Sequence, residues 1–165
     1  MIEVAPLSTP IGPLALAARE GAVCAVWFGP LESLERLLAR WYPGERPAPA
    51  ADPAGAASAL SVYFAGDLHA LDDIPVVLNG TPFQRRVWER LREVPAGRTA
   101  TYGAIAAAIG ARSAVRAVGA ANGANPVSII VPCHRIIGAN GSLVGYGGGL
   151  ERKRWLLDHE SRRLF

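Results

Sequence analysis

The chain has 165 residues, half of them apolar, which is enough to bury one large core or two small ones without disulfides. It has no apolar run long enough to span a bilayer, and its first residues, MIEVAPLSTP, lack the regions of a signal peptide, so we expect no membrane and a cytoplasmic location. Two cysteines, Cys24 and Cys133, and three scattered histidines make no zinc-ligand pattern, so we expect no metal and no cofactor.

Charge is divided unevenly along the chain. Residues 1–81 contain four Arg against nine acidic residues, whereas residues 82–165 contain thirteen Lys and Arg against five acidic residues. Such an excess is expected of a half that binds a polyanion, which makes the C-terminal half the candidate for nucleic-acid binding. Sixteen of the seventeen basic residues are Arg, so biased genome composition and an ordinary solvated surface remain the alternative explanation.

The first 42 residues predict a small sheet covered by a helix. Three short apolar runs, EVAPLST, LALAA and AVCAVWF, are separated by the turn residues Gly12-Pro13 and Glu20-Gly21, which indicates antiparallel strands. Cys24 lies in the third of these runs, where a small thiol usually serves packing. Residues 31–42 have apolar side chains near helical spacing, which predicts an amphipathic helix on the sheet.

Proline and charge mark the end of the first lobe. Four Pro between positions 43 and 53 predict irregular structure, and Asp52-Pro53 resembles an N-cap and N1 pair that opens a helix ending near Gly66. Residues 71–80 read as a short strand or linker, and the charge balance changes sign just beyond them. We therefore expect two domains, an N-terminal α/β lobe over 1–80 and a C-terminal domain over 81–165.

The C-terminal domain should begin with three helices. Thr81, Pro82 and Gln84 provide an N-cap, a proline at N1 and a capping box. Further on, Thr101 caps a short helix that Gly110 ends, and Ser113 caps a second helix, which gives the form of a helix-turn-helix. The second helix is rich in Ala and Gly and offers few groups that could read base edges, so an ordinary tight helix pair is the alternative.

A cysteine follows this helix pair in a setting that suits chemistry. The β-branched run before Cys133 predicts a buried strand, and Asn140-Gly141 predicts a hairpin turn ahead of four glycines around Tyr146. A thiol becomes a strong nucleophile only as the thiolate, so it needs a base or a positive field, for which His134 and Arg135 are candidates.

The span from TPFQRRVW to LLDHE resembles the O6-alkylguanine-DNA alkyltransferase family. PCHR (132–135) follows the helix-turn-helix motif RAVG (116–119) and the dipeptide Asn125-Pro126 in the order and spacing typical of that family, and YFAGDL in the N-terminal half resembles another of its segments. The resemblance implies an α/β (α+β) fold, with a ribonuclease H-like N-terminal sheet lobe and a mostly helical C-terminal lobe containing the helix-turn-helix and a short hairpin.

The resemblance also implies catalytic roles. Cys133 is expected to accept one alkyl group from O6-alkylguanine, and from O4-alkylthymine, in a single turnover. His134 would activate Cys133 through a water, and Glu160 would hold the other ring nitrogen of His134, in the order of nucleophile, base and orienter. Asn125 would support the active-site turn, and Tyr102 would donate to the leaving guanine.

The implied partner is double-stranded DNA bound through the minor groove by a monomer, with cooperative binding left open. The target nucleotide would rotate out of the duplex, and Arg116 would take its place. The other expected DNA contacts are Tyr102, Ser113, Ala114, Ala117 and Ala121, and the expected pocket wall comprises Val144, Tyr146, Gly147 and Gly148.

Three other functions are compatible with parts of the pattern. The related alkyltransferase-like proteins bind the same lesions without the acceptor cysteine, which the intact PCHR argues against. A sequence-reading regulator with Cys133 as a redox switch fits poorly with the alanine-rich helix, and a thiol protease or transferase of small substrates would leave the basic helix-turn-helix unused.

Overall fold

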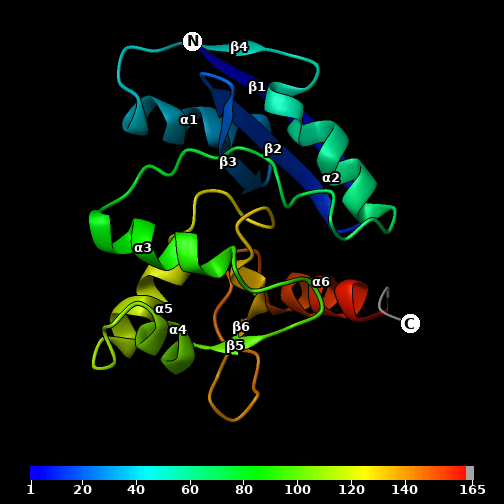
Figure 1. Cartoon of the computed structure of the whole chain (residues 1–165). Coiled ribbons are helices and arrows are strands. Elements are labelled where there is room, and N and C mark those ends of the chain that lie inside the picture. The colour runs from blue at the N-terminus through cyan, green and yellow to red at the C-terminus, as the bar shows by residue number, and fades with distance from the viewer. Residues whose placement is uncertain (163–165) are drawn as a thin grey trace. The chain divides into compact units, whose positions relative to one another are not determined.

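The computed structural model describes residues 1–162, so the last three residues of the expected C-terminal domain lie outside it. The chain forms two compact units, one from Met1 to Asn79 and one from Gly80 onward (Figure 1). Each unit has its own secondary structure, and together they give the expected mixture of a sheet lobe and a mostly helical lobe.

The first unit is built on a four-stranded sheet. Strands β1 (Ile2–Thr9), β2 (Gly12–Arg19) and β3 (Ala22–Phe28) pair antiparallel as predicted, and β4 (Pro47–Pro49) adds a parallel edge strand in the order β3-β2-β1-β4. The expectation of irregular structure throughout the proline-rich segment was therefore wrong. An edge strand needs hydrogen bonds on one side only, which is why it tolerates two prolines.

Two helices pack on this sheet. Helix α1 (Leu31–Trp41) contacts β1 and β2 and buries Leu34 and Leu38, as its apolar spacing predicted. The predicted helix after Asp52 is divided into a short 3-10 helix, η1 (Pro53–Gly55), and helix α2 (Ala56–Phe64), because Ala54 and Gly55 have left-handed backbone angles. Asp52 still serves as a cap, since its carboxylate accepts from the backbone N–H groups of Ala57 and Ser58.

Cys24 belongs to the core of the first unit. Its side chain is fully buried in a cluster with residues of β1, β2 and α1, and burial raises the pKa of its thiol to about 11. A thiol of such high pKa is almost entirely protonated at neutral pH and reacts slowly, which agrees with a packing role. The expected strand or linker near 71–80 forms turns and one isolated bridge between Val23 and Val76.

The second unit opens with three helices. Helix α3 (Pro82–Leu91) has the predicted capping box between Thr81 and Gln84, and Thr101 caps α4 (Tyr102–Ala108) as predicted. Helix α5 (Val115–Gly123) is the second helix of the pair, but Ser113 does not cap it. The chain makes a further turn at Ala111–Ala114, so Ala114 takes the N-cap position and the helix begins later than a Ser113 cap requires.

The segment after α5 differs most from expectation. Residues 127–132 form a tight turn instead of a buried strand, with a backbone bond from Val131 N–H to the Val127 carbonyl and Ile129 at φ +72°. Cys133–Arg135 form a 3-10 helix, η2, and β6 (Ile136–Ile137) pairs in parallel with β5 (Ala100–Thr101). The predicted turn at Asn140-Gly141 is present, but it does not connect the two strands of a hairpin.

The chain then continues through the glycine-rich loop to helix α6 (Leu150–Arg162). The indole of Trp88 on α3 is buried and donates to the Ala121 carbonyl at 2.7 Å, which ties α3 to α5. No helix within residues 1–162 is both long and apolar enough to cross a membrane.

Gly80 and Gly123 provide a matched test of this packing. A Cβ on Gly80 would come within 2.5 Å of the buried Trp88 ring, whereas a Cβ on Gly123 meets nothing within 4 Å. Gly80→Ala should lower the free energy of unfolding by about 1–3 kcal/mol through overpacking. Gly123→Ala should leave it unchanged or raise it by about 0.5–1 kcal/mol. Urea unfolding of both variants measures this, and equal effects would contradict the packing described.

Candidate active site and DNA-binding helix

Cys133 lies in η2 with only 4% of its surface exposed, supported from below by two asparagines. Asn125 donates from Nδ2 to the Val131 carbonyl at 2.7 Å and accepts from Val127 N–H at 2.9 Å, so it closes the 127–132 turn. Asn122 on α5 donates to the carbonyl of Cys133 at 3.3 Å. The backbone that carries the thiol is therefore fixed by side chains from its own turn and from the helix pair.

The next two residues share one carboxylate. His134 Nε2 lies 2.8 Å from Glu160 Oε2, and Arg135 binds the same carboxylate through two bonds, Nε to Oε1 and Nη2 to Oε2, both 2.9 Å. Arg135 also donates from Nη1 to the Val94 carbonyl at 2.7 Å. All three side chains are buried, and His134 Nδ1 is a buried atom without a hydrogen-bond partner among the described residues.

Burial and charge act against each other at these groups. Burial raises the pKa of the Cys133 thiol, while Asn125, the positive charge of Lys153 and Ser128 act to lower it. Burial lowers the pKa of His134 against the pull of the Glu160 carboxylate. Burial alone would raise the pKa of Glu160, but its bonds with His134 and Arg135 outweigh that effect and hold the pKa well below its usual range. Glu160 is therefore ionised, and the His134 nitrogen facing it carries the proton.

Lys153 and Tyr102 anchor the glycine-rich loop. Lys153 is fully buried and its ammonium group donates to the carbonyls of Ile136 at 2.5 Å, Val144 at 2.9 Å and Gly145 at 3.4 Å. The hydroxyl of Tyr102 donates to the same Val144 carbonyl at 3.0 Å. The expected pocket residues 144–148 thus stand next to Tyr102, with Val144 exposed and Gly148 buried.

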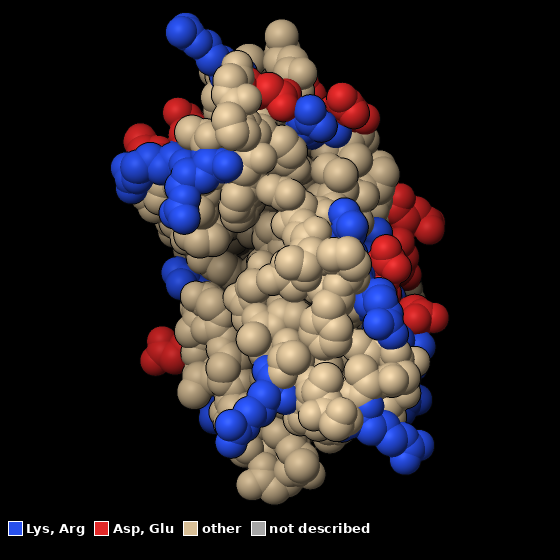
Figure 2. All heavy atoms as spheres, turned by 90° about the vertical axis from the view of Figure 1, so that its left-hand side faces the viewer, with Lys and Arg blue, Asp and Glu red and all other residues tan. Residues whose placement is uncertain are grey.

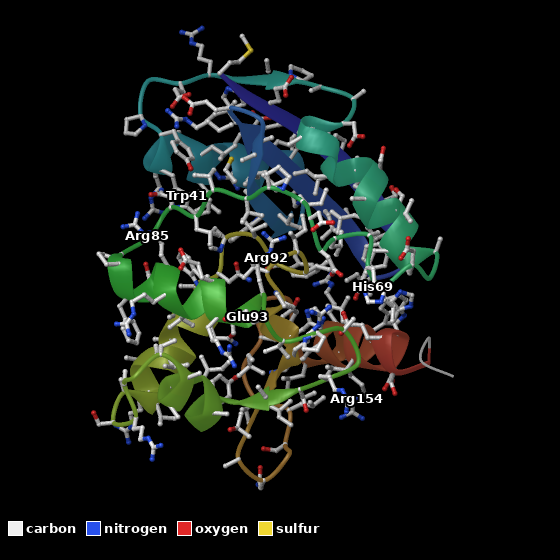
Figure 3. All side chains as sticks on the ribbon, in the orientation of Figure 1. Trp41, His69, Arg85, Arg92, Glu93 and Arg154 are labelled. Atoms are coloured by element: carbon white, nitrogen blue, oxygen red, sulfur yellow. The ribbon has the colours of Figure 1, made fainter. Side chains whose placement is uncertain are left out.

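The exposed face of α5 is almost free of polar side chains. Arg116 and Ala117 are exposed, as is Ser113 in the preceding turn, while Ala114 is half-buried. Ala121 was expected among the DNA contacts, and its burial corrects that expectation. Only 2% of Ala121 is exposed, because it lies on the buried side of α5, where its carbonyl accepts from Trp88. On the face in Figure 2, Lys and Arg side chains form separate groups among uncharged atoms. Arg85 on α3 and Arg154 on α6 are both exposed, and Figure 3 labels them on opposite sides of the view.

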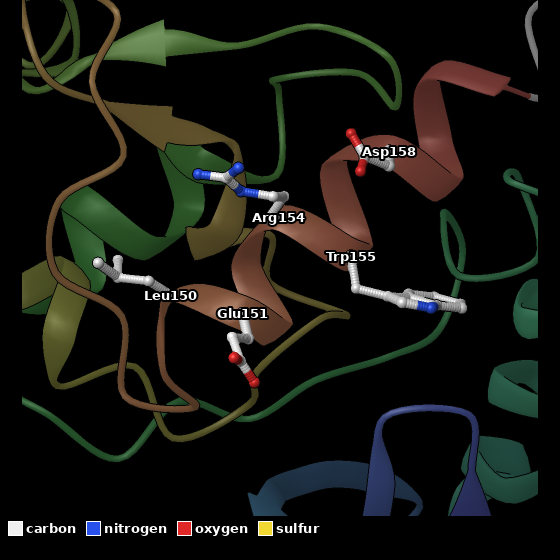
Figure 4. Close-up of a pocket in the computed structure, with 5 residues that line it drawn as sticks. All are labelled: Leu150, Glu151, Arg154, Trp155 and Asp158. Carbon is white, nitrogen blue, oxygen red and sulfur yellow. The ribbon is translucent and has the colours of Figure 1, made fainter.

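A pocket on α6 is lined by none of the residues expected to be catalytic. It is lined by Leu150, Glu151, Arg154, Trp155 and Asp158, all on one side of the helix (Figure 4). Lys153 and Glu160, which serve the site, are buried instead of lining this pocket. Within the described chain, no group of three or more His, Cys, Asp or Glu could hold a metal ion.

Three features of the site were not predicted from the sequence: Lys153, Asn122 and the bidentate contact of Arg135. Lys153 is the only lysine beside sixteen arginines, and it stands seven residues before Glu160, which places both on one face of a helix. Those two facts could have singled it out. Asn122 and the bidentate contact of Arg135 left no comparable signal, because both depend on partners distant in sequence.

The chain resembles known proteins over nearly its whole length. Residues 82–162 match the family model described as 6-O-methylguanine DNA methyltransferase, DNA binding domain. The chain is 48% identical to a methylated-DNA-protein-cysteine methyltransferase of Salmonella typhimurium, covering 96% of this chain and 95% of that one. It is 49% identical to the enzyme of the same name from Mycobacterium tuberculosis, covering 99% and 94%. The chain therefore belongs to the methylated-DNA-protein-cysteine methyltransferase family.

Solved structures show the same fold. A crystal structure of Mycobacterium tuberculosis O6-methylguanine methyltransferase matches with a TM-score of 0.80 and 43% identity, covering 99% of this chain and 94% of that one. Mycobacterium tuberculosis OGT in complex with DNA matches with a TM-score of 0.78 and 43% identity, covering 98% and 93%. The predicted family and fold class are thereby confirmed.

The ionised Glu160 predicts how stability depends on pH. Its pKa in the folded chain lies below the value of about 4.3 expected when unfolded, so its stabilising effect is present above that pH and is lost as the pH falls. The difference in free energy of unfolding between the wild type and Glu160→Gln should be largest above about pH 5 and shrink below about pH 4. Glu151→Gln, exposed on the same helix, is the matched control. A difference for Glu160→Gln that stays constant across this range would contradict the account.

Proposed function

We propose that this protein is a methylated-DNA-protein-cysteine methyltransferase that repairs DNA by moving an alkyl group from the O6 of guanine onto Cys133. The proposal rests on the buried contact between Glu160 and His134, the residue directly after Cys133. The other ring nitrogen of His134, Nδ1, has no hydrogen-bond partner among the described residues. This is the arrangement of a nucleophile, a base and an orienting carboxylate. Its setting beside a helix-turn-helix of a DNA-binding family supplies the substrate class.

The transfer balances as a simple displacement. The thiol proton of Cys133 passes to His134 Nδ1 through a water, and Glu160 stabilises the imidazolium that forms. The sulfur attacks the alkyl carbon, the bond from that carbon to O6 breaks, and the guanine leaves with the electron pair. Tyr102, whose hydroxyl is held beside the glycine-rich loop, donates a proton to the departing base, and the proton taken up by His134 then restores the hydroxyl. The product is a thioether on Cys133 and a restored guanine.

DNA binding would use the second unit, residues 81–165. A base within a duplex hides its O6 substituent, so the nucleotide must leave the stack, at a cost that is lower for a damaged base. We propose that α5 enters the minor groove, where its small exposed residues allow close approach, and that Arg116 fills the vacated place. Ser113, Ala114 and Ala117 would contact the backbone nearby, and the loop around Val144, Tyr146, Gly147 and Gly148 would wall the pocket.

Several finer features stay predictions from the sequence. They are activity on O4-alkylthymine, a monomeric state in solution, cooperative binding on DNA and a cytoplasmic location. The alternative of a lesion sensor without transfer is disfavoured by the intact Cys133 and its buried His134–Glu160 pair.

The two cysteines make the proposal directly testable. Cys133→Ser should bind a duplex containing O6-methylguanine with near wild-type affinity but lose methyl transfer, because a hydroxyl is a far poorer nucleophile at neutral pH. Cys24→Ser, which changes the thiol buried in the first unit, is the matched control and should still transfer. Binding by gel shift and transfer from radiolabelled DNA measure both properties. Near wild-type transfer by Cys133→Ser would overturn the assignment.

Arg116→Ala separates base extrusion from chemistry. Without a side chain to fill the vacated place, transfer from duplex DNA should slow, while reaction with free O6-benzylguanine should change little. Arg112→Ala removes the same charge from the exposed turn before α5 and should weaken duplex binding without this selective effect. Equal losses on both substrates for Arg116→Ala would contradict the proposed role.

A further inference from the structure

The buried carboxylate of Glu160 is bonded by His134 and by Arg135, and of these two residues only His134 has a part in the transfer proposed above. His134 meets Glu160 Oε2 through one nitrogen, whereas Arg135 occupies both oxygens. A bidentate guanidinium is the stronger partner, because its two parallel bonds match the geometry of the carboxylate. Most of the negative charge of Glu160 is therefore already balanced before His134 becomes charged.

From this geometry we propose that Arg135 is a positioning residue that keeps His134 neutral, so that His134 remains a base instead of becoming one half of a permanent ion pair with Glu160. The inference rests on the proposed function of His134. Without Arg135, the buried carboxylate would lose its bidentate partner, the imidazole would balance more of its charge, and the ring would hold its extra proton at neutral pH. A ring already protonated cannot accept the thiol proton.

Most of the surroundings of His134 favour a neutral ring, and Glu160 alone among the charged groups named here acts against it. Glu160 and Lys153 face it from α6, Arg135 and the Cys133 thiol come from its own 3-10 helix, and the residues after α3 contribute the uncharged Val94 carbonyl that holds Arg135. Two positive groups thus act against one negative group, and burial further lowers the pKa of His134.

The protonation of His134 decides what its second ring nitrogen, Nδ1, can do. With Glu160 ionised, Nε2 must carry a proton in order to donate, so a neutral ring presents a lone pair at Nδ1. A charged ring would instead present an N–H group at Nδ1. A lone pair at Nδ1 can take up the thiol proton through the water proposed above, whereas an N–H group cannot.

The pH dependence of transfer to wild type and Arg135→Met tests the proposal. The low-pH limb of the rate should move to higher pH by about one unit or more in Arg135→Met, because a carboxylate without its guanidinium raises the pKa of a neighbouring histidine. Arg154→Met, which removes the same charge from the exposed side of α6, should leave the limb in place. An unmoved limb in Arg135→Met, or one moved to lower pH, would overturn the proposal.

Glu160→Gln distinguishes this role from a structural one. Removal of the carboxylate should move the same limb to lower pH, opposite to Arg135→Met, although both variants break the same contact. In the double variant Arg135→Met, Glu160→Gln, the limb should return to its wild-type pH or move to a lower pH. Shifts in the same direction for both single variants would show that the contact only maintains the fold.

A measurement on the unmodified chain tests the proposal without any substitution at Arg135 or Glu160. The ring nitrogens of His134, assigned by comparison with His134→Gln, should show a neutral ring protonated at Nε2 in nitrogen NMR at pH 7. An imidazolium signal at pH 7 would overturn the proposal. The NMR signal does not depend on methyl transfer, so its failure can be distinguished from failure of the Cys133→Ser test. Only the latter would remove the proposed function itself.

Discussion

The buried carboxylate of Glu160 holds the candidate site together. It accepts from His134 and twice from Arg135, and it reaches them from α6 while they stand on the 3-10 helix that carries Cys133. A buried charge is tolerated only with such partners, so the position of α6 and the orientation of the imidazole are set together. Removing Arg135 would take away the stronger of the two partners and leave the buried charge less well balanced. The helix that closes the described chain is in this sense part of the active site.

The backbone around this carboxylate is fixed by neutral and positive side chains. Asn125 closes the turn before Cys133, and Lys153 gathers carbonyls from β6 and the glycine-rich loop. Asn122 connects α5 to the Cys133 carbonyl, and Trp88 connects α5 to α3. Because the helix proposed to bind DNA is bonded to the backbone of the proposed acceptor, recognition and chemistry rest on one rigid framework. A thiol held in this way, with only 4% of the residue exposed, would be reached by a base that has left its duplex, as proposed above.

Local chemistry made part of this framework predictable. The caps at Thr81 and Thr101, the strands β1 to β3 and helix α1 follow from residue spacing and capping alone. The turn at 127–132 did not, since its β-branched residues favour a strand, whereas the bonds made by Asn125 and the backbone bond from Val131 to Val127 close a turn with Ile129 in a left-handed conformation. The cap at Ser113 failed because the chain makes one more turn first. The expected roles of Glu160 and Arg116 came from family resemblance, as nothing in their spacing separates them from ordinary surface charges.

The central claim is that Cys133 accepts one alkyl group and keeps it. A thioether is neither a leaving group at neutral pH nor open to thiol exchange, and Cys24 lies buried in the other unit. The direct measurement is a titration of the protein with excess duplex containing O6-methylguanine, followed by intact mass and peptide mapping. Restored guanine should stop at one equivalent of protein, and a single methyl group should be found on Cys133. Continued product formation beyond one equivalent, or a methyl group on another residue, would contradict it.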